Sequence, residues 1–387
     1  VDSQSAPAPV GGAQDGYVAR LSPDGTVTWI TTLGSPGEAT VNKLAVDAAG
    51  NAYLAGYYNG DFTFGATTFS GGGGGPALYK VGPDGSKVFA RFGTLVGNTR
   101  FVNNFNSVAV SGNNIYVSGE VDGQWSFEGT PITPNALRDA VLINYGTDGS
   151  LKWVKTLAGP GEDYSAEVTV DGAGNVFWTG DFDGATATVD AVSVTNSGSG
   201  YDIFLAKVNG TDGAVLWGKS AGTPNESDFP YSLTTDGNSV FVAGTMGYGA
   251  TSFDSNTLSN GRLFLASYGT DGTVRWVDKS EGSFGLPWGL EYSPVDQGIL
   301  MTGSFEYTQR FGVTDLIDQG NRNGFLVFHN DSGLPIPAAP GAFQAFATFD
   351  GSVSAKWAAV PGIASYSLER ADDFIGPYSQ IASLPDS

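Results

Sequence analysis

Apolar and polar residues alternate over short stretches of this chain, and turn residues separate the stretches. Tyr17–Leu21 is the first such stretch, and Pro, Asp and Gly follow at positions 23–25. Pro pre-sets the backbone of a turn and Gly accepts a positive φ, so the pattern predicts a hairpin whose second strand is Thr26–Leu33. No apolar run approaches the roughly 18 residues of a membrane-spanning helix, and no helical stripe exceeds a couple of turns. The chain is therefore expected to consist of β-strands.

A second hairpin completes a four-stranded group. We predict a strand at Lys43–Val46, a turn at residues 47–51 and a returning strand at Ala52–Tyr57. Short strands joined by tight turns pair as one antiparallel sheet. Residues 59–75 form a longer connection, after which the alternation restarts at Ala77–Val81.

Two sets of markers repeat this group with one period of about 60 residues, a length expected of propeller blades or stacked solenoid units. The turn glycines are Gly25, Gly85, Gly149, Gly213 and Gly272, with Gly333 as a partial sixth. Four residues after each of the first five stands an aromatic: Trp29, Phe89, Trp153, Trp217 and Trp276. The glycines that close the second hairpin are Gly56, Gly119, Gly180, Gly244 and Gly303. Two independent markers in step indicate duplication.

Four strands in about 60 residues match a propeller blade better than a solenoid coil, which needs fewer. The expected fold class is all-β, a β-propeller of four-stranded antiparallel blades. We take the Lys43 strand as the innermost of its blade, and equivalent strands begin near Asn106, Ala166, Tyr231 and Gly289. This gives five blades, and the repeated aromatics are expected to pack between the sheets.

Six blades, or an open ring, are the alternatives, because residues 324–329 open a further hairpin that lacks its Trp strand. The N-terminal hairpin is expected to close the ring on the last inner pair, residues 289–305. This arrangement leaves the strand at Phe325 without a predicted partner.

The repeat stops after Ser332, and three prolines mark the change of composition. We divide the chain into residues 1–15, a linker or processed N-terminus; 16–333, the propeller; 334–342, a Pro-rich linker; and 343–387, a partial β-sandwich. In the last segment, alternation at residues 345–349, the Asp350-Gly351 turn and the strand Tyr366–Arg370 support the β assignment.

The units resemble the bacterial secreted propeller repeat family often called SBBP. The resemblance rests on an Ala-Lys strand, an Asp-Gly turn and a Trp strand at Leu205–Trp217, and on Val-Asp-x-x-Gly-Asn leading into a strand that ends in Gly at Val170–Gly180. It covers roughly residues 16–333. It implies a secreted or surface-anchored protein, and it implies no particular activity.

The C-terminal segment resembles the start of a fibronectin type III domain. The residues that carry this resemblance are Ala355, Trp357, Pro361-Gly362, Ser365-Tyr366, Leu368-Glu369-Arg370 and Gly376-Pro377-Tyr378. The segment is shorter than such a domain. We therefore expect either that the natural chain continues or that a neighbour supplies the missing strands.

Charge and rare residues narrow the function. The net charge is −21, from 39 acidic and 18 basic residues, so the surface repels phosphate backbones and anionic lipids. We expect neither a nucleic-acid partner nor membrane insertion. The absence of Cys excludes disulfides, thiolate metal sites and Cys nucleophiles. His329 is the only histidine, which disfavours His-dependent triads and multi-His metal sites.

Carboxylates offer the remaining catalytic chemistry. Glu167 and Glu291 fall on predicted inner strands, where propeller glycosidases place paired carboxylates. The structural interpretation is that they are buried and paired, with Lys43 as one partner. Asp181, Asp183 and Asp190 gather acid oxygens that could hold Ca²⁺ as a cofactor, although their spacing matches no EF-hand loop. The alternative there is a solvated acidic loop.

Aromatic residues outside the repeat pattern lie in or beside the long connections, where a rigid scaffold usually carries its binding residues. The candidate ligand-binding residues are Trp125, Tyr164, Phe229, Tyr248, Trp288 and Tyr307. The favoured hypothesis is a noncatalytic extracellular or cell-surface binding or structural module with a protein or glycan ligand at this loop face. The alternatives are a carbohydrate-active enzyme that uses the two glutamates, and a homo-oligomeric surface or filament subunit that shares strands.

Overall fold

The computed structural model of the chain describes residues 15–34, 38–69, 73–97, 103–135, 137–312, 314–317 and 322–330, and four strands between residues 344 and 385. Throughout these ranges the regular elements are β-strands, which confirms the expected all-β class. No helix in them is long and apolar enough to cross a membrane. Of the expected linkers, residues 1–15 and 334–342, only Asp15 lies within the described residues.

Antiparallel four-stranded units follow one another along the described chain. The first unit is β3 (Glu38–Val46), β4 (Ala52–Asn59), β7 (Gly74–Val81) and β8 (Lys87–Leu95). The second is β9 (Phe105–Ser111), β10 (Asn114–Val121), β13 (Asp139–Gly146) and β14 (Leu151–Leu157). The third is β15 (Asp163–Val170), β16 (Asn175–Phe182), β19 (Asp202–Asn209) and β20 (Val215–Gly222).

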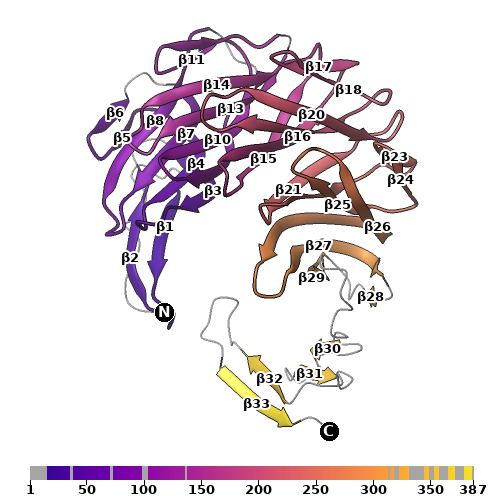
Figure 1. Cartoon of the computed structure of the whole chain (residues 1–387). Helices are drawn as coiled ribbons and strands as arrows, with labels where there is room; N and C mark the ends of the chain where they lie inside the picture. The colour runs from indigo at the N-terminus through magenta and orange to yellow at the C-terminus, as the bar shows by residue number, and fades with distance from the viewer. Residues whose placement is uncertain are drawn as a thin grey trace.

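The long strand β26 joins the last two units. The fourth unit is β21 (Phe229–Thr235), β22 (Ser239–Thr245), β25 (Leu263–Gly269) and the first half of β26 (Val274–Ser293). The second half of β26 opens the fifth unit, with β27 (Gly298–Phe311), β29 (Asn323–Asn330) and the short β28 (Thr314–Leu316). Figure 1 shows the units arranged around an arc, with β1 at one end and β27 and β29 at the other. The first strands of successive units contact one another, so the arrangement is propeller-like.

The long connections inside the units are small hairpins. They are β5 (Phe62–Phe64) with β6 (Thr67–Phe69), β11 (Trp125–Phe127) with β12 (Thr130–Ile132), β17 (Thr186–Val189) with β18 (Val192–Thr195), and β23 (Ala250–Phe253) with β24 (Asn256–Ser259). The hairpin of one unit reaches the outer strand of the preceding unit: β11 pairs with β8, and β23 pairs with β20. Neighbouring units are thereby joined at their outer edges.

The expected ring closure is wrong. The N-terminal hairpin, β1 (Tyr17–Leu21) with β2 (Val27–Thr32), forms a two-stranded sheet of its own. The edge of β27 is taken instead by β29, in a ladder from Gly298–Asn330 to Phe305–Asn323. Phe325 is buried there against Phe305 and Phe311. The strand that had no predicted partner therefore pairs within its own chain, and this apolar packing stabilises the pairing.

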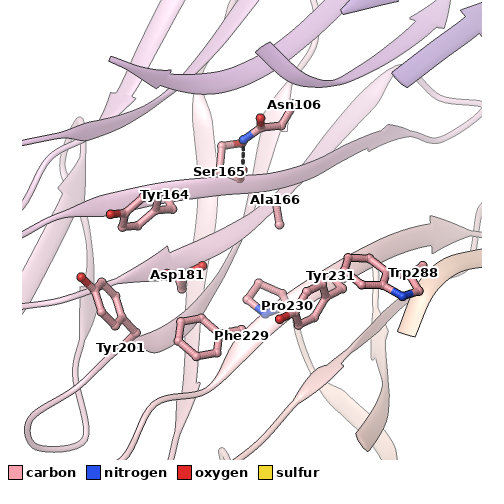
Figure 2. Close-up of a pocket in the computed structure, with 10 residues that line it drawn as sticks. All are labelled: Asn106, Tyr164, Ser165, Ala166, Asp181, Tyr201, Phe229, Pro230, Tyr231 and Trp288. Atoms are coloured by element: carbon pink, nitrogen blue, oxygen red, sulfur yellow. Dashed lines mark hydrogen bonds between the residues drawn. The ribbon is translucent and has the colours of Figure 1, made fainter. Parts of the chain in front are cut away.

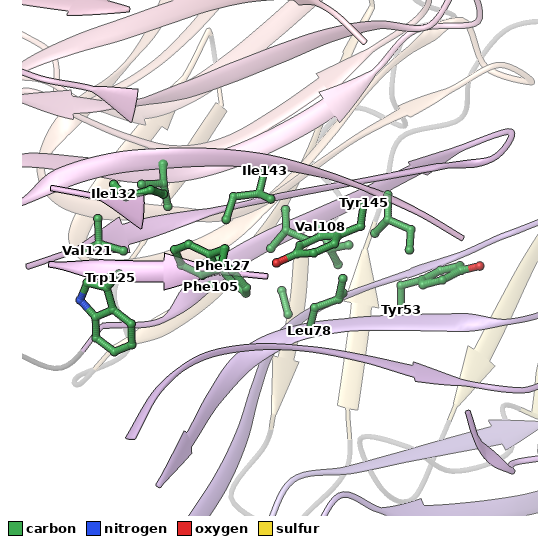
Figure 3. Close-up of a cluster of buried hydrophobic side chains, with 14 of the residues drawn as sticks. Tyr53, Leu78, Phe105, Val108, Val121, Trp125, Phe127, Ile132, Ile143 and Tyr145 are labelled. Carbon is green, nitrogen blue, oxygen red and sulfur yellow. The ribbon is translucent and has the colours of Figure 1, made fainter. Parts of the chain in front are cut away.

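Apolar cores lie between successive sheets. Figure 3 shows the cluster between the first two units, where Tyr53, Leu78, Val108 and Ile143 pack together. Full burial of a large apolar side chain contributes about 1.5–3 kcal/mol. These clusters therefore hold each unit against the next.

The repeated Trp residues cover the turn of the following unit, as expected for packing between sheets. In three of them the indole Nε1 donates to a carbonyl there: Trp29 to Pro83 at 3.0 Å, Trp153 to Gly210 at 3.2 Å and Trp217 to Thr270 at 3.1 Å. A Cβ on Gly85 would lie only 2.9 Å from the Trp29 ring, and Gly85 has a φ of 83°. The turn glycine is required by both its backbone conformation and its contact.

The first strand of every unit carries a β-bulge, which leaves one residue without a pair. The bulged residues are Asn42, Asn106, Ala166, Tyr231 and Trp288. Opposite each bulge stands a glycine of the second series. On Gly56 and Gly180 a Cβ would lie under 3.0 Å from a carbonyl oxygen of the bulged strand, closer than real Cβ atoms come. These glycines allow the backbones to approach and the bulge to form.

The described strands after residue 343 form two separate pairs. β30 (Gln344–Ala347) pairs with β31 (Val353–Lys356), and β32 (Ser365–Arg370) pairs with β33 (Ser379–Pro385). The predicted strand Tyr366–Arg370 is confirmed as part of β32. Trp357 lies outside the described residues.

Candidate functional site

A pocket of about 490 Å³ opens where the bulged strands of four units meet. It is lined by Asn106, Tyr164, Ser165, Ala166, Asp181, Tyr201, Phe229, Pro230, Tyr231 and Trp288 (Figure 2). Four of the five bulged residues are among these. The bulge therefore directs side chains of the inner strands into the pocket.

The position of the pocket follows from an interrupted series of asparagine bridges. Asn42 Nδ2 donates to the Phe105 carbonyl of the next unit at 2.9 Å. Asn106 Nδ2 donates in the same way to the Ser165 carbonyl at 2.7 Å. The third unit has Ala166 at this position, and a methyl group cannot reach the following strand. The series ends there, and the pocket opens.

Two aromatic residues fill the next two bulges and form one wall. The rings of Tyr231 and Trp288 meet edge to face, with centroids 5.5 Å apart. Trp288 Nε1 donates to Ser304 Oγ at 3.1 Å, and the side chain is still 56% exposed. One indole face is thus held in place while remaining accessible to solvent.

Three more aromatic rings form the opposite wall. Tyr201 lies 5.8 Å, centroid to centroid, from both Tyr164 and Phe229. The hydroxyls of Tyr164 and Tyr201 both donate to Glu162 Oε2, at 2.9 and 3.1 Å. Burial, and then the Glu162 hydrogen bond, raise the pKa of Tyr164 to about 12, so both hydroxyls stay protonated at neutral pH. The shared acceptor fixes the orientation of the two rings.

Asp181 lies beside the wall formed by Tyr164, Tyr201 and Phe229, on β16 directly after Gly180 (Figure 2). The residue is only 8% exposed, and within the described residues its carboxyl makes no hydrogen bond. Burial, followed by the charges of Glu120 and Asp163, raises the pKa of Asp181 well above its ordinary value. A buried carboxyl without a partner at the wall of a pocket makes Asp181 a candidate recognition group for a ligand.

Glu120 occupies the position equivalent to Asp181 in the preceding unit. Its carboxyl accepts from Asn106 Nδ2 at 2.7 Å and from Asn104 Nδ2 at 3.3 Å. Burial raises the pKa of Glu120 to about 7, against the lowering effect of Arg138 and Asn106. Asn106 therefore joins the acid of one unit to the backbone of the next.

A third buried acid, Asp163, begins β15. Its Oδ2 accepts from the Gly159 N–H at 2.7 Å. Burial and then the nearby Asp139 carboxyl raise the pKa of Asp163 to about 8. The region around the pocket thus holds several carboxyls whose ionisation is opposed by burial and by one another.

Three of the six candidate ligand-binding aromatics come together in this pocket, namely Tyr164, Phe229 and Trp288. Tyr248 and Tyr307 are exposed elsewhere, and Tyr248 covers the Arg262 guanidinium at 4.6 Å. Trp125 is fully buried between the first two units and donates to the Asp122 carbonyl at 2.8 Å. We therefore assign Trp125 to the core.

The three candidate calcium ligands are not brought together. Asp181 lines the pocket, whereas Asp190 forms an ion pair with Lys155 Nζ at 2.6 Å. Asp183 raises the pKa of Asp163 by its charge. In the described part of the chain, no group of three or more acidic or His side chains is arranged to hold a metal.

The two candidate catalytic glutamates are in different environments. Glu167 forms the expected ion pair with Lys43, and its Oε2 also accepts from Ser232 Oγ at 2.8 Å and from the Leu233 N–H at 2.7 Å. Glu291 is exposed on β26. Neither residue lines the pocket.

Tyr201, Tyr231, Asn106 and Glu120 were not selected from the sequence. A signal for one of them, Glu120, lies beside the second-series glycines. The residues that follow these glycines are Tyr57, Glu120, Asp181, Thr245 and Ser304, so only two neighbouring units carry an acid. Counting from these glycines, rather than from the turn glycines, would have paired Glu120 with Asp181.

No family model matches the chain, and no curated protein matches it. Similar solved structures include a protein from Lactobacillus plantarum, with 12% identity, a TM-score of 0.41, and coverage of 92% of this chain and 89% of that one. A europium-containing methanol dehydrogenase has 10% identity, a TM-score of 0.36, and coverage of 95% and 77%. A GH43 β-1,3-galactosidase has 9% identity, a TM-score of 0.33, and coverage of 88% and 97%. Since all three scores are below 0.5, the description of the fold rests on the sheets of this chain.

Proposed function

We propose that this chain is a noncatalytic extracellular binding module and that the pocket between Tyr164 and Trp288 is its ligand site. One observation carries the proposal: five aromatic side chains from three units line one pocket together with a buried carboxyl that has no partner in the described residues. Aromatic faces supply apolar contact area, and the carboxyl supplies orientation.

We prefer binding to catalysis because of the hydrogen-bond partners and the exposure of the two candidate glutamates. A glycosidase needs one protonated and one ionised carboxyl on either side of the scissile bond. Glu167 is committed to Lys43, Ser232 and Leu233, and Glu291 is exposed. The ligand would be a protein or glycan group that presents an apolar face and at least one donor.

The test is a binding screen against glycan and peptide arrays, with the Trp288→Ala variant beside the unchanged chain. Loss of one wall should weaken binding of any hit by about tenfold or more, since stacking and burial of an aromatic contribute above 1 kcal/mol. Tyr248→Ala is the matched control, because it removes an exposed aromatic outside the pocket. Equal binding by all three proteins would refute the assignment of the site, and turnover of a bound glycan would refute the noncatalytic role.

We also propose that residues 16–333 form a five-bladed propeller related to the secreted SBBP repeats, and that residues 343–387 begin a fibronectin-like domain. Five successive bulged strands and the two strand pairs after residue 343 support this division. Limited proteolysis should give a resistant fragment that ends near residue 333. First cleavage within the repeats would contradict the boundary.

A further inference from the structure

We infer that the pocket selects an alkylammonium group, such as a lysine side chain, its N-methylated forms or a free quaternary amine. This inference rests on the proposed function, because it names the ligand class of the same site. It is carried by the aromatic walls, by the buried carboxyl that lines the same pocket, and by the charged residues around the pocket.

The walls provide what a cation–π site needs. A cation is attracted to an aromatic face when it lies within about 6 Å of the ring centroid. The Tyr231–Trp288 pair and the Tyr164–Tyr201 pair face one pocket, and their members are 5.5 and 5.8 Å apart. A compact cation beside either pair could therefore approach both of its rings.

The hydroxyls of these tyrosines are not needed to bind the cation. Those of Tyr164 and Tyr201 donate to Glu162, so they are used within the protein. This donation to a carboxylate leaves the two rings rich in electrons. The Arg138 guanidinium already lies 4.8 Å from the Tyr164 centroid, which shows that this ring accepts a cation.

Asp181 supplies the counter-charge. Its carboxyl is more than nine-tenths buried and has no hydrogen-bond partner within the described residues. Glu120 and Asp163 act on it as like charges. A neutral ligand would leave that repulsion in place, whereas an ammonium ion would relieve it.

The surrounding charges favour a cation over an anion. Acidic groups near the pocket come from several elements: Glu120 on β10, Asp139 on β13, Glu162 and Asp163 at the start of β15, and Asp183 after β16. Two guanidiniums oppose them, Arg138 beside Tyr164 and Arg262 near Tyr231. Acids outnumber bases here, so a bound cation would favour ionisation of these carboxyls, whereas a phosphate or carboxylate ligand would oppose it.

The decisive experiment compares choline with 3,3-dimethylbutan-1-ol, which differs only in replacing the quaternary nitrogen by carbon. Both are titrated calorimetrically into the full chain at low ionic strength. Choline should bind at least about tenfold more tightly than its neutral isostere. Its affinity should also rise as the pH is raised through about 7, the pKa of Glu120, because ionisation of that carboxyl strengthens the attraction. Equal binding of the two compounds would overturn the inference.

Variants test the role of individual side chains in binding, and each is checked for folding. Asp181→Asn retains the shape of the side chain and removes the charge, so it should weaken choline binding about fivefold or more and leave binding of the neutral isostere unchanged. Trp288→Ala should weaken both ligands, and Tyr248→Ala should weaken neither. Thermal melts of each variant confirm that it is folded. An Asp181→Asn variant that binds choline as well as the unchanged chain would refute the role of the carboxyl.

The two proposals fail in different ways. If neutral array ligands bind and depend on Trp288 while choline does not bind, the pocket is a ligand site and the ammonium inference is wrong. If nothing that binds depends on Trp288, the proposed function itself is wrong. Peptides with lysine or trimethyllysine, run beside choline, separate a protein partner from a free amine.

Discussion

The first and third units share one backbone device and use it differently. In the first unit the bulged residue, Asn42, spans to the carbonyl of Phe105 in the next unit. In the third unit the bulged residue is Ala166, which leaves a pocket in front of Pro230. The facing glycines, Gly56 and Gly180, are under the same steric constraint. The scaffold is therefore common to the repeats, and one side chain at the bulge decides whether two units are bridged or leave a site between them.

The largest expected effect is on the shared device itself. Gly180→Ala would place a Cβ under 3.0 Å from the Tyr164 carbonyl oxygen, so the bulge of the third unit could not keep its geometry. We expect a loss of about 4 kcal/mol or more in the free energy of unfolding, measured by urea denaturation. Gly56→Ala should cost a similar amount in the bridged unit. Gly172→Ala is the control, because nothing lies within 4 Å of that position. A mild effect at Gly180 would break the comparison.

The buried acidic residues are a second difference between the units. Glu120 has a folded pKa of about 7, above its usual 4.5, so between these values the folded chain keeps a proton that the unfolded chain loses. Stability should therefore fall as pH rises from about 4.5 to 7. The change is about 3 kcal/mol at most, since one pKa unit corresponds to about 1.4 kcal/mol. Glu120→Gln should flatten the curve of melting temperature against pH. An equally steep curve for the variant would contradict this account.

Removing an existing bridge should cost less. Asn106→Ala takes away the donor to both Ser165 and Glu120, and it leaves a buried carboxyl with one partner fewer. We expect a loss of about 1–3 kcal/mol in unfolding free energy, read from chemical denaturation. Asn42→Ala, which breaks only one hydrogen bond, is the matched comparison and should be milder. The reverse order would mean that Glu120 contributes nothing to the bridge.

The smallest expected change in stability comes from building the missing bridge. Ala166→Asn should donate to the Pro230 carbonyl, as Asn106 does to Ser165, and gain up to about 1 kcal/mol. The same side chain would fill the pocket, so ligand binding should be lost while the melting temperature is kept or raised. Ala166→Ser, too short to span, should retain binding. A bridged variant that still binds would show that the open bulge does not define the site.

The sequence was sufficient to predict the repeats, but it was not sufficient to predict which side chains meet at the pocket. Turn glycines and Trp residues with one period predicted the sheets and their order, because local turn chemistry and packing between units fix both. The bulge could not be read, because it depends on the register of two strands. Trp125 and Trp288 illustrate the limit: both stand outside the repeat, and only the fold buries one in a core and exposes the other at a pocket. The pairing of β29 with the edge of β27 could not be predicted either, because it depends on competition between two strands for one edge.

The hairpins β11–β12 and β23–β24 have a consequence for how such an array can change its length. Each is encoded within one unit and completes the outer edge of the unit before it. When a unit is lost during evolution or in engineering, the preceding unit loses the hairpin that pairs with its outer strand; when a unit is gained, its hairpin must pair with a new outer strand. An outer strand left unpaired can pair with other chains. Units are interchangeable only if the incoming hairpin fits the outer strand it inherits. Selection on copy number thus acts on the joint between two units as well as on the unit itself.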